Sequence, residues 1–154
     1  MTVTIAVESP LQDDVRTLVA ELNTVLHALS PPEACYHLTV EQMAEPTVTV
    51  WIASDGDTVV GCGALKRHSG TVGEVKRMFT RPDWQGQGIG RRILGEILAA
   101  AEREGLATLV LETGDQHPAA WAIYEKAGFS RCGPVLDYPA SPYSVFYQKQ
   151  LSAA

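Results

Sequence analysis

The stretch from Thr80 to Arg92 constrains the fold of this chain more than any other part. It reads Thr-Arg-Pro-Asp-Trp-Gln-Gly-Gln-Gly-Ile-Gly-Arg-Arg. Residues 72–79 before it are apolar and β-branched, as in a strand, and apolar residues recur at helical spacing over residues 89–101. Backbone N–H groups at such a helix start can converge on one anion, which the helix dipole also favours. The sequence therefore predicts a strand, a glycine loop that holds phosphate, and a helix.

Two familiar phosphate motifs do not fit this loop. A P-loop requires Lys and then Ser or Thr after its last glycine, whereas Arg91 and Arg92 follow Gly90. The dinucleotide fingerprint G-x-G-x-x-G needs a third glycine where this chain has Arg91 or Ile93, depending on the register. On glycine spacing alone, the loop is therefore either a phosphate site of another pattern or an ordinary glycine-rich helix start.

A third pattern, Gln/Arg-x-x-Gly-x-Gly/Ala, is matched by Gln85, Gly88 and Gly90. On this match the chain resembles the GNAT superfamily of acyl-CoA-dependent N-acetyltransferases, in which this loop holds the pyrophosphate of coenzyme A. Residues 74–80 are similar to the superfamily's fourth strand, and residues 118–129 to a late helix that ends in Tyr-Glu-x-x-Gly-Phe.

The resemblance implies that residues 1–154 form one domain of the α+β class, an α/β/α sandwich. Its central sheet should be mixed and mostly antiparallel, with about seven strands, a splay between strands four and five, and about four flanking helices. Apolar periodicity and turn residues agree with this architecture. They predict strands at residues 3–7, 47–52, 58–65, 72–79, 107–111, 129–132 and 144–150, and helices that begin at residues 11, 39, 89 and 118.

Charge is distributed unevenly along the chain. Of the net −6, residues 1–64 carry −8 (one basic, nine acidic), residues 65–92 carry +5 (seven and two), and residues 93–154 carry −3 (four and seven). A basic segment in an acidic chain suits a small polyanion such as coenzyme A better than a nucleic acid. We therefore expect no nucleic-acid partner.

The chain has neither a signal-peptide pattern nor an apolar run long enough to span a membrane, so a cytoplasmic protein without a membrane partner is expected. Cys35, Cys62 and Cys132 lack CxxC spacing, which argues against a disulfide framework and a zinc site. No metal is therefore expected. The sequence leaves the oligomeric state open, a homodimer included.

Transfer of an acetyl group to an amine requires a base for the amine, stabilisation of the oxyanion, and an acid for the departing thiolate. The resemblance places Tyr124 beside the thioester sulfur, and a phenol with a pKa of ~10 can donate a proton at pH 7. It offers two candidate bases. Glu74, in the fourth strand, is the first choice, and the alternative is that it is only paired with Lys76 or Arg77, which would weaken it as a base. Glu112, at the end of the next strand, is the second choice.

The resemblance also implies the binding residues. Main-chain groups of residues 78–80 would meet the pantetheine arm, and His117 stands where relatives often have Asn. The segment around Tyr36 and His37 would line the acceptor pocket, and Arg77 could meet an acidic group of the substrate, the alternative being solvated surface. The implied coenzyme contacts are Met78, Phe79, Thr80, Gln85, Gly86, Gln87, Gly88, Ile89, Gly90, Arg91 and His117.

Strand alternation groups the side chains of the fourth strand. In the absence of a bulge, residues 74, 76 and 78 share one face, and residues 75, 77 and 79 share the other.

The leading hypothesis is an acetyl-CoA-dependent N-acetyltransferase for a small primary amine. The alternatives are acetylation of a protein N-terminus or lysine, and a non-catalytic acyl-CoA sensor.

Overall fold

The computed structural model describes residues 2–29, 38–68 and 70–151. Every strand and helix expected from the sequence has a counterpart in these ranges, although strands two, three and five extend further than expected. The elements in chain order are β1 (Val3–Val7), α1 (Asp13–Leu29), α2 (Val40–Met43), β2 (Val48–Asp55), β3 (Thr58–Arg67), β4 (Val72–Thr80), the 3-10 turn η2 (Pro82–Trp84), α3 (Ile89–Arg103), β5 (Thr108–Gly114), α4 (Pro118–Lys126), β6 (Ser130–Cys132) and β7 (Ser144–Gln150).

The strands form one mixed sheet in the order β1-β2-β3-β4-β5-β7-β6. All neighbouring strands are antiparallel except β4 and β5, which are parallel because α3 carries the chain back to the same end of the sheet. Both the seven-stranded sheet and its one parallel crossover confirm the prediction.

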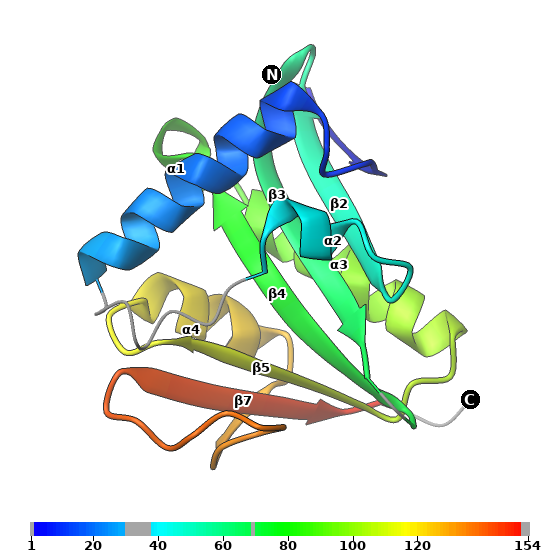
Figure 1. Ribbon diagram of the computed structural model, residues 1–154, viewed down its shortest axis with the longest axis vertical. Helices are drawn as coiled ribbons and strands as arrows, with labels where there is room; N and C mark the ends of the chain where they lie inside the picture. The colour runs from blue at the N-terminus through cyan, green and yellow to red at the C-terminus, as the bar shows by residue number, and fades with distance from the viewer. Residues whose placement is uncertain (1, 30–37, 69, 152–154) are drawn as a thin grey trace.

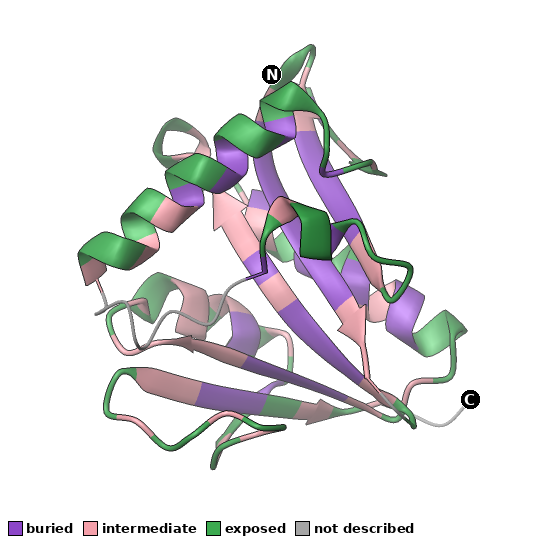
Figure 2. Ribbon diagram, in the orientation of Figure 1, coloured by how far each residue is buried: buried purple, intermediate pink, exposed green. Residues whose placement is uncertain are grey.

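Apolar side chains pack on both faces of the sheet. One cluster joins α1 and α2 to alternate residues of β2 and β3, such as Val50 and Ile52. The other joins α3 and α4 to the residues between them, such as Trp51 and Ala53. In Figure 2 the buried residues of α1 lie on its sheet-facing side, and the exposed ones point outward. The result is a three-layer α/β/α arrangement (Figure 1).

The splay between β4 and β5 begins early. Their pairing covers only Val72–Glu74 of β4 against residues 108–110 of β5. Beyond it, residues 75–80 and 111–114 separate, and Figure 1 shows the two strands diverging from their common end. The separation leaves one edge of β4 without a strand partner.

A β-bulge in β4 coincides with this splay. The register between β3 and β4 shifts between Cys62 and Ala64, so that β4 has one residue more than its partner there. Arg77 lies at the shift with a φ of 58°, in the left-handed region that non-glycine residues rarely adopt.

The bulge overturns part of the predicted alternation. Met78 packs with Val75 in the cluster under α3, whereas Phe79 packs in the cluster under α1. The predicted grouping of Met78 with Glu74, and of Phe79 with Val75, is therefore wrong. The physical reason is the extra residue, which inverts the facing of every later side chain in the strand.

Candidate active site

A cleft of about 750 Å³ opens where β4 and β5 diverge. Its walls come from β4, β5, the glycine loop, α4 and the apolar side chains Leu22, Val25 and Leu26 of α1. In the sequence these three residues follow the apolar spacing of an amphipathic helix, and nothing in that pattern predicts their place in the site. The cleft brings together most of the predicted site residues: Arg77, Met78, Phe79, Thr80, Gln85, Gly86, Gly88, Ile89, Gly90, Arg91, Glu112, His117 and Tyr124.

Four predicted residues are not placed in the cleft wall. Glu74 and Gln87 do not line it. Tyr36 and His37 lie outside the described residues.

The glycine loop has the geometry of an anion cradle. Gly86 and Gly88 have φ values of 80° and 81°, and Gly88 is the N-cap of α3 without any side-chain hydrogen bond. The first helical hydrogen bond runs from the Arg92 N–H to the Gly88 carbonyl at 3.0 Å. The N–H groups of residues 89–91 therefore have no partner within the helix. These donors, at the positive end of a helix dipole, fit the pyrophosphate of coenzyme A.

Most basic side chains of the segment 65–92 form hydrogen bonds or ion pairs with other parts of the protein. Arg91 lines the cleft, and its Nη2 lies 3.5 Å from where a Cβ of residue 88 would be. The other contacts in the segment are Arg67 to Glu104 at 2.5 and 2.6 Å, Lys76 to Glu74 at 3.1 Å, Arg81 to Glu21 at 2.7 Å, and Arg92 to the Val3 carbonyl at 2.9 Å. Arg91 is thus the member of the segment placed at the cradle.

Tyr124 of α4 lines the cleft and is otherwise buried, with 6% of its surface exposed. Its ring packs against Phe129 and Tyr147, each at a centroid distance of 5.9 Å. Burial raises the pKa of its phenol, and the nearby Glu112 carboxylate raises it further. The hydroxyl therefore keeps its proton at neutral pH and can act as an acid.

Glu112 of β5 borders the same cleft. Its neighbour Leu111 is buried in the cluster under α3 and α4, so strand alternation directs Glu112 to the α1 face. Ser144 Oγ donates a hydrogen bond of 2.7 Å to its Oε2. Burial raises the pKa of this carboxyl, although the Ser144 hydrogen bond opposes the shift. A carboxylate with a raised pKa is a better base than an ordinary one.

Glu74 is held in a closed polar network. Only 3% of its surface is exposed, and His68 Nε2 lies 2.9 Å from its Oε1. Its Oε2 accepts hydrogen bonds from Lys76 Nζ at 3.1 Å and from the Tyr138 hydroxyl at 2.5 Å. Lys76 stands two residues from Glu74 in the same strand, so this contact follows from the sequence. The contact with Tyr138 could not be predicted, because Tyr138 lies in the loop before β7, far along the chain. Both carboxylate oxygens of Glu74 are thus engaged within the protein, and the residue does not line the cleft.

Arg77 is buried rather than part of the solvated surface, with 6% of its side chain and backbone surface exposed. Its Nη2 donates to Asn23 Oδ1 of α1, while Nε and Nη1 are buried without a partner. Burial lowers the pKa of the guanidinium to about 10, so it remains charged at neutral pH. The surface interpretation of this residue is therefore wrong.

His117 is the N-cap of α4 but makes no side-chain capping hydrogen bond. Its ring packs on Gly114, where a Cβ would lie 2.5 Å from His117 Cδ2. Burial lowers the pKa of the imidazole, and Nε2 is buried without a partner. A neutral ring with an unused nitrogen at the cleft wall suits contact with a ligand.

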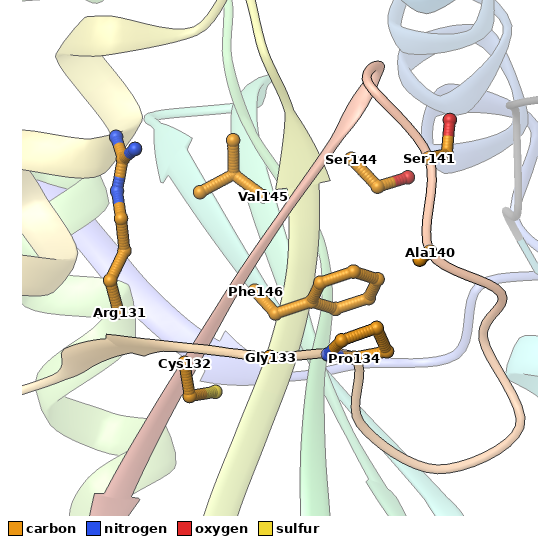
Figure 3. Close-up of a pocket in the computed structure, with 9 residues that line it drawn as sticks. All are labelled: Arg131, Cys132, Gly133, Pro134, Ala140, Ser141, Ser144, Val145 and Phe146. Atoms are coloured by element: carbon orange, nitrogen blue, oxygen red, sulfur yellow. The ribbon is translucent and has the colours of Figure 1, made fainter.

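A second hollow of about 240 Å³ lies between the end of β6 and the start of β7 (Figure 3). The guanidinium of Arg131 points away from Ala140 and Ser141 in Figure 3 and stacks on Trp121, 4.6 Å from the ring centroid. This hollow includes none of the predicted site residues.

Within the described ranges, no group of three or more His, Cys, Asp or Glu side chains could hold a metal ion. Of the helices that the structure describes, none has both the length and the apolar character to cross a membrane.

The splayed parallel pair, the glycine cradle and the buried tyrosine at the gap define an acyl-CoA-dependent acyltransferase. Residues 15–129 match the model of the Acetyltransferase (GNAT) family. The chain belongs to this family, and it is an acetyltransferase enzyme. Acetyltransferases of this fold use acetyl-CoA.

Similar proteins agree with this assignment. An IAA acetyltransferase of Azospirillum brasilense is 44% identical over 97% of this chain and 98% of its own length. An uncharacterized N-acetyltransferase of Bacillus subtilis (strain 168), YsnE, is 38% identical over 88% of this chain and 93% of its own length. A solved structure from Klebsiella pneumoniae, assigned as an acyl-CoA N-acyltransferase, superposes with a TM-score of 0.82 at 30% identity and covers 98% of this chain and 99% of that one.

Proposed function

We propose that this N-acetyltransferase acetylates a primary amine of a small molecule by direct attack in a ternary complex, with Glu112 as base and Tyr124 as acid. One observation carries the proposal. Glu112 and Tyr124 border the same cleft, Glu112 from the α1 face of the sheet and Tyr124 from the α4 side. Two proton-handling groups thus flank the gap between β4 and β5.

The cradle and β4 would hold acetyl-CoA. The N–H groups of residues 89–91 and the Arg91 side chain would bind the pyrophosphate, and the unpaired edge of β4 over residues 78–80 would bind the pantetheine amides. His117 would offer Nε2 to the same arm. The bound coenzyme supplies an activated acetyl thioester.

The two side chains complete the transfer. Glu112 takes a proton from the amine, so that the nitrogen can form the new C–N bond to the acetyl carbon. Tyr124 gives its proton to the sulfur as the C–S bond breaks, and coenzyme A leaves as the thiol. The phenol has a proton to give at neutral pH, because an ordinary phenol has a pKa of ~10 and burial raises that of Tyr124 further.

Two observations favour a small acceptor over a protein N-terminus. The IAA acetyltransferase of Azospirillum brasilense is similar over almost the whole chain, whereas the [ribosomal protein bS18]-alanine N-acetyltransferase of Escherichia coli (strain K12) is 45% identical over only 32% of it. The α1 side of the cleft is also lined by Leu22, Val25 and Leu26, which suits a compact apolar group.

A screen of pooled amines tests the proposal. Purified protein with acetyl-CoA is expected to release free thiol with small primary amines and not with a bS18 N-terminal peptide. Release with the peptide alone would favour the protein-acceptor alternative. Tight acetyl-CoA binding without any turnover would instead favour the non-catalytic sensor.

A further inference from the structure

Among the residues that the structure describes, Arg77 is a buried cation without a counter-ion. None of the ion pairs among the described residues involves it, and its one side-chain hydrogen bond goes to the neutral amide of Asn23. The adjacent Cys62 cannot compensate the charge, because burial raises the pKa of its thiol to about 12. Two guanidinium nitrogens, Nε and Nη1, are left without any partner. Such a group is costly in an isolated protein.

The backbone at Arg77 is costly as well. A non-glycine residue at a φ of 58° is strained, and such strain persists where the surrounding structure holds it and often at ligand sites. The bulge is what turns this side chain toward α1, across the wall of the cleft. Strand, bulge and helix thus combine to hold an unsatisfied cation beside the site.

Arg77 lies on the α1 side of the cleft, opposite the coenzyme cradle, where the acceptor amine would bind. It contacts α1, whose Leu22, Val25 and Leu26 line the cleft, whereas the glycine cradle lies at the start of α3. Glu112 faces the same side of the sheet. An acceptor amine that meets Glu112 would therefore place its other substituents among Arg77 and the apolar residues of α1.

We propose that the acceptor carries a carboxylate next to its amine together with an apolar side chain, and that Arg77 binds the carboxylate. The inference rests on the acetyl-transfer function proposed above and names its acceptor class. A carboxylate matches the fork of a guanidinium and would supply the missing counter-ion. The guanidinium engages it by turning about its terminal torsions into the cleft that Arg77 lines.

Matched acceptors test the proposal. We expect acetyl transfer to L-leucine, L-methionine or L-phenylalanine, and a kcat/KM lower by roughly 10- to 150-fold for the corresponding amides, the factor expected for a hydrogen bond to a charged group. The amides have the less protonated amines at neutral pH, so ionisation alone would favour them. Equal or faster turnover of the amides, or turnover only of amines without a carboxylate, would overturn the inference and leave acetyl transfer intact.

Substitutions at Arg77 test the residue itself. Arg77→Met keeps the stem and removes the charge, so it should raise KM for the amino acid and abolish the preference over the amide. Arg77→Lys should restore part of this preference. Arg67→Met, which removes an equal charge paired with Glu104 away from the cleft, should change neither.

Two further measurements separate a binding role from a structural one. The affinity of Arg77→Met for acetyl-CoA, from calorimetry, should equal that of the wild type, because the coenzyme contacts lie elsewhere. Its Tm without ligand should be equal or higher, since an unpaired buried charge is gone. A lower Tm with equal losses on the acid and the amide would contradict the proposal. If the wild-type protein itself does not bind acetyl-CoA, the proposed function is refuted instead.

Discussion

Gly88→Val tests why residue 88 is a glycine. Either the missing side chain leaves the anion cradle open, or the left-handed backbone alone requires glycine. Gly88 has a φ of 81°, so any L-residue there is strained by about 1–2 kcal/mol, and a β-branched one by at least that much. The nearest atom to an added Cβ is Arg91 Nη2 at 3.5 Å, so the Cβ itself meets no clash. Valine would instead occupy the space in front of the helix N–H groups.

Gly105→Val is the matched control. Gly105 follows the other end of α3 with a φ of 75°, and an added Cβ there would meet nothing within 4 Å. Both variants should therefore lose a similar stability, a fall in Tm of about 2–8 °C for a chain of this size. Only Gly88→Val should lose acetyl-CoA binding.

Calorimetry with acetyl-CoA, well below the Tm of both folded variants, checks this expectation. An unchanged affinity in Gly88→Val would refute the cradle. An equal loss of affinity in Gly105→Val would show that strain in α3, rather than a filled anion site, controls binding.

Two further predictions concern charge. Arg91→Gln should lower acetyl-CoA affinity several-fold and make it less sensitive to salt, whereas Arg92→Gln, which loses a contact to the Val3 carbonyl, should leave the salt dependence unchanged; equal slopes in the two titrations would remove Arg91 from the site. Because burial raises the pKa of Glu112, its stabilising protonated form is lost as pH rises through that pKa, so Glu112→Gln should raise Tm more at pH 7 than at pH 4. Thermal melts at the two pH values check this, and a gain confined to pH 4 would contradict it.

The glycine loop and Tyr124 could be predicted from the sequence because each depends on local pattern. Glycine at a helix start permits a left-handed backbone, and the first N–H groups of any helix lack partners within it. Gly86 and Gly88 indeed have positive φ values, and Tyr124 lies at the cleft on the expected helix.

The roles of Glu74 and Arg77 could not be predicted, because both depend on contacts between distant segments. Tyr138 ties up Glu74 from the loop before β7, and Asn23 meets Arg77 from α1. Strand periodicity also fails at a bulge, which no residue type in β4 announces. The sequence did indicate both candidate bases, of which Glu112 lines the cleft and Glu74 does not.

Steady-state and binding measurements on Tyr124→Phe test the central claim most directly. The variant keeps the ring that packs against Phe129 and Tyr147 and removes only the hydroxyl. We expect kcat to fall by about 10²- to 10⁴-fold, the usual value of general acid–base assistance, with acetyl-CoA affinity and Tm nearly unchanged. A kcat near that of the wild type, or a loss of activity that only follows a lower Tm, would contradict the assignment of Tyr124 as the acid.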